Sequence, residues 1–271
     1  MQGEIHALDR AARLERLSEG RYVGATNPAY ANMAGPFGGA TAAVLINAVM
    51  LDARRLADPI ALTVNFCAPI ADGGFQIETK LQRGGRTTQH WSMELVQDGA
   101  VCATASAVCG ARKPVWSHYP VKAPSAPPRD SLTEMPKDGR PEWTRCYSFR
   151  FVEGGLDNFS RDGLIRSPRS LAYIQDAPAR KLDFLALAAL SDAFFVRIIH
   201  ARGTFQPMAT ISLTTYFHVD AEELASNGAT ALLGEADAAI FHNGFADQTC
   251  ALWTPEGRLI ANGVQITWYK K

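Results

Sequence analysis

The sequence predicts an α+β protein made of two tandem copies of one unit. Each half contains one long apolar segment, at 37–57 and 182–200, followed by several strand-like segments. Both sets of strands begin with a threonine and a later phenylalanine: Thr63 and Phe66 in the first half, Thr210 and Phe217 in the second. Self-similarity of this kind indicates a duplicated unit, and a helix followed by long antiparallel strands indicates the α+β class.

The composition is that of a soluble globular protein, with 271 residues, 47% of them hydrophobic, and zero formal net charge. The absence of a basic excess argues against a nucleic-acid partner. No apolar run reaches membrane-spanning length, and the charged N-terminal segment 1–20 lacks the apolar core of a signal peptide. The five cysteines are widely spaced and mostly in apolar segments, which fits buried thiols in the cytoplasm rather than disulfides.

The first unit, residues 1–110, is expected to begin with a short amphipathic helix. One face of this helix would carry Leu8, Ala12, Leu14 and Leu17. Gly38 and Gly39 then open an apolar helix over 40–56, which should be buried because it has few charges on any face. The expected strands, separated by Gly-containing turns, are 21–26, 60–68, 74–83, 87–97 and 100–110.

Residues 111–142 interrupt the pattern and are expected to form a linker. They contain seven of the fifteen prolines: 114, 120, 124, 127, 128, 136 and 141. This density of proline favours an extended chain on the surface. The second unit, 143–271, then repeats the design with a long helix over 182–200. Its expected strands are 142–151, 169–175, 208–219, 228–241, 244–254 and 258–269.

A single carboxylate, Asp192, lies in the middle of the second apolar helix segment. Burying an unpaired carboxylate is costly, so this side chain requires hydrogen-bond donors nearby or a raised pKa. Asp192 is therefore either a structural residue bonded to an adjacent loop or a member of a functional site, and the sequence leaves both interpretations open.

Two polar side chains lie in the strands that follow. Thr210 belongs to a strand whose alternation places it on one face with Ser212, Thr214, Tyr216 and His218. Gln265 lies near the C-terminus among inward-facing small residues: Ala261, Gly263 and Thr267. Each residue alone is more often structural, because threonine is common in strands and a lone strand glutamine is usually solvated.

The first unit lacks this combination, since its last strand carries no amide and its helix has no acidic residue before Asp52. Only the second unit therefore combines an acid, a hydroxyl and an amide. The sequence has no nucleophile-elbow, Walker, Rossmann, His-Glu-x-x-His or Cys-x-x-Cys motif, so the chemistry requires neither a metal nor an obvious serine or cysteine nucleophile.

These motifs resemble the bacterial type II acyl-CoA thioesterases, a double-hotdog family. In the first half the resemblance rests on Gly-Pro-Phe37-Gly-Gly-Ala, Leu62-Thr-Val-Asn-Phe66 with Pro69, and Arg83-Gly-Gly-Arg86. In the second half it rests on Leu190-Ser-Asp192, Ala209-Thr210-Ile211 with Phe217-His218, and Val264-Gln265. The resemblance covers roughly residues 20–269 and implies two hotdog repeats, each with a long buried helix wrapped by an antiparallel sheet.

The resemblance implies that Asp192, Thr210 and Gln265 are catalytic and together hold one water that attacks an acyl-CoA thioester. Asp192 would accept the proton of that water. Amides at the glycine-opened helix start, at Gly38 and Gly39, would bind the oxyanion or coenzyme A, although close packing of helix and sheet explains these glycines equally well. No cofactor or metal is implied, and the pathway would be fatty acid metabolism.

The sequence departs from close members of the family at Ser212 and Leu213, where they have Asp-His, and at Val219, where they have a basic residue. Two alternatives therefore stay open: a non-catalytic acyl-CoA or acyl-ligand-binding hotdog protein, and a hotdog dehydratase, for which His200 is the nearest histidine. Unpaired strand edges predict self-association, with a homodimer as the simplest assembly, and no nucleic acid or membrane as partner. Acyl chain length is not determined by the sequence.

Overall fold

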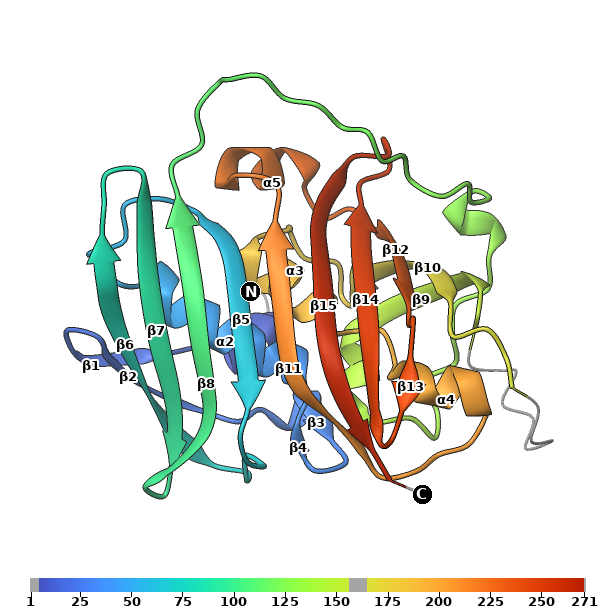
Figure 1. Ribbon diagram of the computed structural model, residues 1–271, viewed down its shortest axis with the longest axis horizontal. Helices are drawn as coiled ribbons and strands as arrows, with labels where there is room; N and C mark the ends of the chain where they lie inside the picture. The colour runs from blue at the N-terminus through green and yellow to red at the C-terminus, as the bar shows by residue number, and fades with distance from the viewer. Residues whose placement is uncertain (1–4, 156–164, 271) are drawn as a thin grey trace.

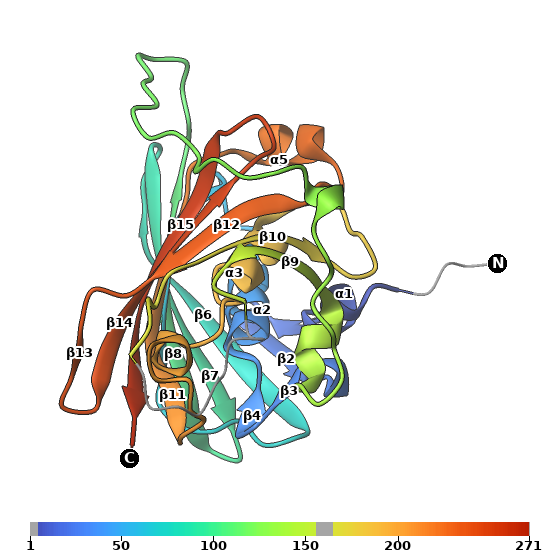
Figure 2. The ribbon, with the colours of Figure 1, turned by 90° about the vertical axis from the view of Figure 1, so that its right-hand side faces the viewer.

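The computed structural model describes residues 5–155 and 165–270. Its main feature is a 13-stranded antiparallel sheet in the order β1-β2-β6-β7-β8-β5-β11-β15-β14-β12-β10-β9, with β13 paired to β14. Figure 1 shows this sheet from the front with helices α2 and α3 behind it, and Figure 2 shows from the side that the sheet curves around these helices. The expected α+β class is confirmed.

The first half supplies helix α2 and the left side of the sheet in Figure 1. Its strands in the large sheet are β1 (Glu15–Ser18), β2 (Arg21–Ala25), β5 (Pro59–Phe66), β6 (Gly74–Gly84), β7 (Thr88–Gln97) and β8 (Ala100–Gly110). Its remaining elements are α1 (Ala7–Ala11), η1 (Pro28–Tyr30), the small pair β3 (Ala31–Asn32) and β4 (Gly35–Pro36), and α2 (Gly38–Met50).

The second half supplies the right side of the sheet. Its strands are β9 (Tyr147–Glu153), β10 (Ser170–Asp176), β11 (Met208–Phe217), β12 (Leu232–Asp237), β13 (Phe241–His242), β14 (Phe245–Trp253) and β15 (Leu259–Tyr269). Its helices are η3 (Glu142–Cys146), α3 (Phe184–Leu190), α4 (Arg197–Arg202) and α5 (Ala221–Asn227). The segment 111–142 contains the short turn η2 (Arg129–Ser131) and the first residue of η3. The division into two units and a linker stays a prediction.

The two halves meet where β5 pairs antiparallel with β11. Thr63 and Thr214 lie opposite each other at this seam, and their Oγ1 atoms are 3.0 Å apart. A pseudo-twofold axis between them relates Pro59–Phe66 to Thr210–Phe217, including a register shift at the same place in both strands. This correspondence identifies, for each polar residue of the second half, its counterpart in the first.

The register shift also corrects the predicted faces of β11. The pairing shifts between Thr210 and Ser212, so the alternation restarts after Ile211. Thr210 therefore lies on the helix side of the sheet with Leu213, and Ser212 lies on the other side. The prediction that Thr210 shares a face with Ser212, Thr214, Tyr216 and His218 is wrong. The extra residue of a β-bulge reverses the faces of the residues on its two sides.

The second long helix is also corrected. The chain over 182–200 forms two short helices, α3 and α4, separated by a non-helical turn that contains Asp192. The first long helix is present but is shorter than the predicted 40–56, since α2 runs from Gly38 to Met50. The apolar periodicity predicted both segments as helical, but α3 ends at Leu190 and the chain forms a turn at Ser191 and Asp192.

Smaller differences occur elsewhere. The N-terminal helix covers only Ala7–Ala11, so Leu8 and Ala12 are buried as expected but Leu17, in β1, is 57% exposed. Residues 1–4 of this prediction lie outside the described residues. The predicted strand 142–151 begins with the 3₁₀ turn η3, and the predicted strand 228–241 is split into β12 and β13.

Helices α2 and α3 pack against each other with opposite directions. A β-carbon on Gly39, at the start of α2, would lie 2.5 Å from the carbonyl oxygen of Ala189, at the end of α3. At the other end of the pair, Asn47 and Met50 lie beside Phe184 and Leu185. Helices of small and apolar residues can approach this closely, and the packing brings the start of α2 beside the end of α3. None of the helices in the described residues is long and apolar enough to cross a membrane.

Candidate active site

A cavity of about 560 Å³ opens between the two halves at the N-terminal end of α2. Its polar lining includes Asp192, Thr210 and Gln265, and Gly38 lies at the same place. The remaining wall is largely apolar and aromatic, with Phe37, Phe66, Trp143, Phe194 and Phe195 among its members. The three residues predicted to be catalytic are thus brought together in one cavity by the turn after α3, by β11 and by β15.

Gln265 links the other two polar side chains. Its Nε2 donates a hydrogen bond to Asp192 Oδ1 over 3.1 Å, and its Oε1 accepts one from Thr210 Oγ1 over 3.1 Å. The amide is almost fully buried, with 2% of its surface exposed. An ionised carboxylate only accepts hydrogen bonds, so Asp192 orients the amide with Nε2 toward it and leaves Oε1 for the Thr210 hydroxyl. The positions of the acid and the hydroxyl are thereby linked through one buried side chain.

Asp192 is 9% exposed, and no cation among the described residues contacts its carboxyl. Burial raises the pKa of its carboxyl to about 7, while hydrogen bonds from Gln265 and from the Gly39 backbone amide act in the opposite direction. A carboxyl group with this pKa is matched to proton transfer near neutral pH. Asp192 is therefore chemically suited to act as a general base.

The start of α2 explains why a carboxylate is tolerated here. Its N-cap residue, Phe37, makes no side-chain capping bond, so the first amides of the helix depend on other partners. One such partner is the carboxyl of Asp192, from the other half, which accepts a hydrogen bond from the Gly39 backbone amide. Helix α3 differs, because its own N-cap residue Asp183 accepts a bond from Ala186 N over 2.8 Å.

Gly38 and Gly39 also have a packing role. A β-carbon on Gly38 would lie 2.7 Å from Asp192 Oδ2, and one on Gly39 would lie 2.4 Å from the ring of Phe37. Both approaches are shorter than a real β-carbon contact, so glycine is required for the helix to approach the carboxyl and the neighbouring ring. The close-packing explanation of these glycines is therefore supported, and it does not exclude a role for their amides.

The aromatic wall was not predicted from the sequence. Phe37 and Trp143 stack with ring centroids 4.3 Å apart, and Trp143 lies 5.3 Å from Phe195. Trp143 belongs to the 3₁₀ turn η3, where the sequence predicts a strand. Several aromatic residues follow Trp143 in the sequence, and they could have indicated an aromatic cluster. The linear pattern does not indicate that Trp143 lies beside Phe37.

Comparison with protein families matches both halves of the chain. Residues 27–110 match the model of the acyl-CoA thioesterase N-terminal domain, and residues 120–269 match that of the acyl-CoA thioesterase C-terminal domain. The chain belongs to the acyl-CoA thioesterase family. No curated protein matches it by sequence.

Solved structures agree with this membership. A hotdog-fold protein of unknown function from Alicyclobacillus acidocaldarius is 35% identical, with a TM-score of 0.93 and 99% of each chain covered. A putative thioesterase II from Thermobifida fusca is 21% identical, with a TM-score of 0.84 and 98% of each chain covered. An acyl-CoA thioesterase II from Mycobacterium marinum is 19% identical, with a TM-score of 0.75, covering 97% of this chain and 98% of that one. The expected double-hotdog architecture is confirmed.

The positions at which this chain departs from the family pattern do not line the cavity. Among the described residues, the cavity lining includes neither Ser212 nor Leu213. Leu213 is buried opposite Gln265, and Ser212 lies on the outer side of β11. His200 also lies outside the cavity, near the end of α4, and burial lowers its pKa to about 2. In the part of the chain that the structure describes, the cavity lining includes no histidine, whereas a hotdog dehydratase would need one beside the acid.

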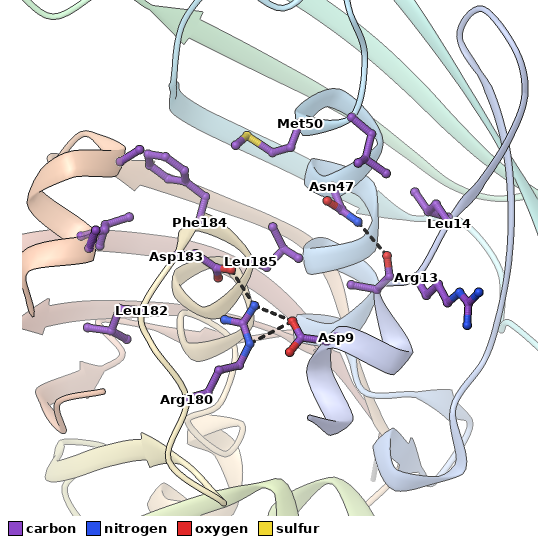
Figure 3. A pocket seen from close by; sticks show the side chains of 15 residues that line it. Asp9, Arg13, Leu14, Asn47, Met50, Arg180, Leu182, Asp183, Phe184 and Leu185 are labelled. Carbon is purple, nitrogen blue, oxygen red and sulfur yellow. Dashed lines mark hydrogen bonds and ion pairs between the residues drawn. The ribbon is translucent and has the colours of Figure 1, made fainter. Parts of the chain in front are cut away.

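A second pocket, of about 590 Å³, lies at the opposite end of the two helices. Figure 3 shows that three of its charged side chains face one another: Arg180 Nη2 lies 2.6 Å from both Asp9 Oδ1 and Asp183 Oδ2. At the pseudo-symmetric positions, Pro59 replaces Thr210 and Ala107 replaces Gln265. The acid, hydroxyl and amide of the first cavity therefore have no equivalent set in the described residues of the first half.

Proposed function

We propose that the protein hydrolyses an acyl-CoA thioester to a free acid and coenzyme A with a water held by Asp192, Thr210 and Gln265. The observation that carries this proposal is the chain of hydrogen bonds from Thr210 through Gln265 to Asp192, at the wall of an apolar cavity. Membership of the acyl-CoA thioesterase family supports the same reaction class.

In the proposed reaction, Asp192 accepts a proton from the bound water as the water oxygen attacks the thioester carbonyl carbon. Thr210 and Gln265 fix the position of the water, so that the attack starts from a favourable geometry. The resulting tetrahedral oxyanion collapses with cleavage of the carbon–sulfur bond. The proton held by Asp192 passes to the departing thiolate, and the products are a carboxylic acid and the thiol of coenzyme A.

The oxyanion requires hydrogen-bond donors at the point where negative charge develops. Gly38 lines the cavity and precedes the first intrahelical hydrogen bonds of α2, which Ala40 and Thr41 donate to Phe37. We assign this role to the Gly38 amide at the positive end of the helix dipole. The amide of Gly39 bonds Asp192 and serves to hold the base.

The aromatic wall suits the acyl group, since Phe37, Trp143 and Phe195 offer a continuous apolar surface beside the three polar side chains. Water is excluded from this side of the cavity once an acyl chain occupies it, which strengthens the electrostatic interactions of Asp192. The nucleotide part of coenzyme A would remain near the cavity mouth. The reaction as proposed uses no cofactor and no metal.

The decisive test is hydrolysis of a panel of coenzyme A thioesters with short, medium, long and aromatic acyl groups, measured by release of free thiol. We expect turnover by the wild type and its loss in Asp192→Asn with the fold retained. Normal activity of Asp192→Asn would disprove the proposed mechanism. Binding of acyl-CoA by the wild type without any turnover would instead establish an acyl-CoA-binding protein.

We also propose that the protein is a homodimer. The outer side of the sheet, opposite the helices, exposes a group of large apolar side chains: Tyr216, Phe245, Val264 and Ile266. They lie on three adjacent strands, β11, β15 and β14, in the middle of the sheet. A second copy of the chain would cover this surface. Sedimentation velocity should show a dimer that becomes a monomer in the double variant Val264→Lys/Ile266→Lys, and a monomeric wild type would reject the proposal.

A further inference from the structure

The turn that follows Asp192 is held by a buried glutamine on a neighbouring strand. Gln248, on β14, has none of its surface exposed. Its Nε2 donates to the carbonyl oxygen of Phe194 over 3.1 Å, and its Oε1 accepts from the backbone amide of Arg197 over 3.2 Å. One side chain thus bonds the later part of the non-helical segment, at Phe194, and the first residue of α4, Arg197.

A buried arginine holds the same turn from its other side. Arg197 is 1% exposed, and its guanidinium donates to Phe195 O over 2.8 Å, to Pro168 O over 3.1 Å and to Ser170 Oγ over 2.6 Å. All of these acceptors are neutral, and burial lowers the pKa of Arg197 to about 9. Burying a cation whose partners are all neutral costs free energy, because the guanidinium loses its hydration. In return, its hydrogen bonds fix the backbone of the turn.

The two glutamines of this region are neighbours. Gln248 on β14 lies directly opposite Gln265 on β15, and both face the helices. The equivalent pair in the first half is Trp91 on β7 and Ala107 on β8, which are apolar and buried. The two amides are therefore present in the half that carries Asp192, and apolar residues take their places in the half that does not. Both halves form the same fold, but only the half with Asp192 has these glutamines. The fold alone therefore does not account for the two amides.

We propose that Gln248 is a positioning residue for Asp192 in the reaction described above, on which this inference rests. Helix α3 has to end at Leu190 for the carboxyl of Asp192 to reach Gln265 and the start of α2. Ending the helix inside the core leaves backbone groups without helical partners, which are costly to bury unpaired. Gln248 supplies partners for two of these groups, while Gln265 bonds the carboxyl itself.

The same clamp shapes the cavity. Phe194 and Phe195, the residues whose carbonyl groups Gln248 and Arg197 bind, both line the cavity. Relaxation of the turn would move the base and the acyl-binding wall together. We therefore expect loss of the clamp to lower kcat, because catalysis tolerates misplacement of the base less than binding does.

The test uses Gln248→Met, which keeps the length of the side chain and removes both hydrogen bonds. We expect kcat to fall about 10- to 100-fold with a smaller change in KM. The midpoint of the pH–rate profile should move upward, since weaker contacts with Gln265 and Gly39 no longer lower the pKa of Asp192. Gln248→Glu, which can still accept from the Arg197 amide, should recover part of the activity. Gln82→Met, at an exposed amide of β6, is the matched control.

A purely structural role would lower the melting temperature of Gln248→Met but leave kcat and the pH midpoint unchanged, and this result would overturn the proposal. Amide hydrogen exchange of the wild type gives a measurement that needs no variant. The first amides of a helix normally exchange fast, so protection of the Arg197 amide would support the clamp and fast exchange would overturn it. These outcomes differ from failure of the proposed function itself. If the protein is not a thioesterase, the wild type will not hydrolyse any thioester.

Discussion

Gln265 Nε2 lies 3.1 Å from Asp192 Oδ1, and this hydrogen bond joins the last strand of the chain to a turn 73 residues earlier. The bond is buried, and Oε1 of the same amide accepts a hydrogen bond from the Thr210 hydroxyl. A buried amide with both ends engaged is held in one orientation. The relative positions of the acid and the hydroxyl therefore depend on a third residue that need not exchange protons itself.

Replacing Gln265 by Met should abolish this arrangement with little change in volume. We expect kcat to fall about 100-fold or more, since an oriented hydrogen-bond donor at a reacting group contributes on this scale. Thioester hydrolysis by Gln265→Met and by the exposed control Gln82→Met would be compared directly. Equal activity of the two variants would show that Gln265 is structural only.

The pH dependence of hydrolysis follows from the raised pKa of Asp192. As a general base the carboxyl has to be ionised, so kcat/KM should rise with pH and level off above about 7. In Gln265→Met, which loses a hydrogen bond that stabilises ionised Asp192, the midpoint of the remaining pH–rate profile should move to higher pH. A profile for the wild type that is flat between pH 5 and pH 9 would argue against Asp192 as the base.

The two glycines at the start of α2 should respond differently to alanine. In Gly38→Ala the new methyl group would collide with Asp192 Oδ2, so we expect hydrolysis to fall with a modest loss of stability. In Gly39→Ala it would meet the backbone of Ala189 and the ring of Phe37, which should cost about 1–3 kcal/mol of stability. Thermal unfolding and kcat would be measured for both.

Gly74→Ala provides the control for these variants, because the nearest atom to its new methyl group is 3.8 Å away. The expected pattern is a larger change in activity for Gly38→Ala and a larger change in melting temperature for Gly39→Ala. The reverse pattern would contradict the assignment of Gly38 to the reacting centre.

A second buried carboxyl, Asp176, should make stability depend on pH. It is 3% exposed, neither oxygen has a hydrogen-bond partner among residues 5–155 and 165–270, and burial raises its pKa to about 7. Since the folded state holds the proton more tightly than the unfolded state, stability should fall as pH rises from about 4 to beyond 7. Asp176→Asn, which stays neutral, should relieve roughly 2–4 kcal/mol of this loss at pH 8.5.

Melting temperatures of the wild type and Asp176→Asn at pH 5 and pH 8.5 would test this prediction. Part of the pH dependence should persist in the variant, because Asp192 titrates in the same range. If Asp176→Asn is destabilised equally at both pH values, the carboxyl is not a source of the pH dependence.

Much of the site could be predicted from residue types and order. The duplicated pattern and the motifs around Asp192, Thr210 and Gln265 predicted the family, and the structure places these three residues in one cavity. The sequence did not predict Gln248, although it is a polar residue among the buried positions of β14, Ala246, Cys250 and Leu252. A signal was present, but a single buried glutamine does not reveal which backbone groups it binds.

The sequence by itself determined the α+β class, the two repeats and the residue types of the candidate site, because apolar periodicity and turn residues act locally. Only the tertiary structure decided where α3 ends and which face of β11 carries Thr210. Periodicity favours one helix over 182–200, yet the helix is interrupted after Leu190, and Gln248 and Arg197 bind the backbone of the interruption. These contacts join segments far apart in the chain, and long-range hydrogen bonds in a buried core outweigh a local preference of a few tenths of a kcal/mol per residue.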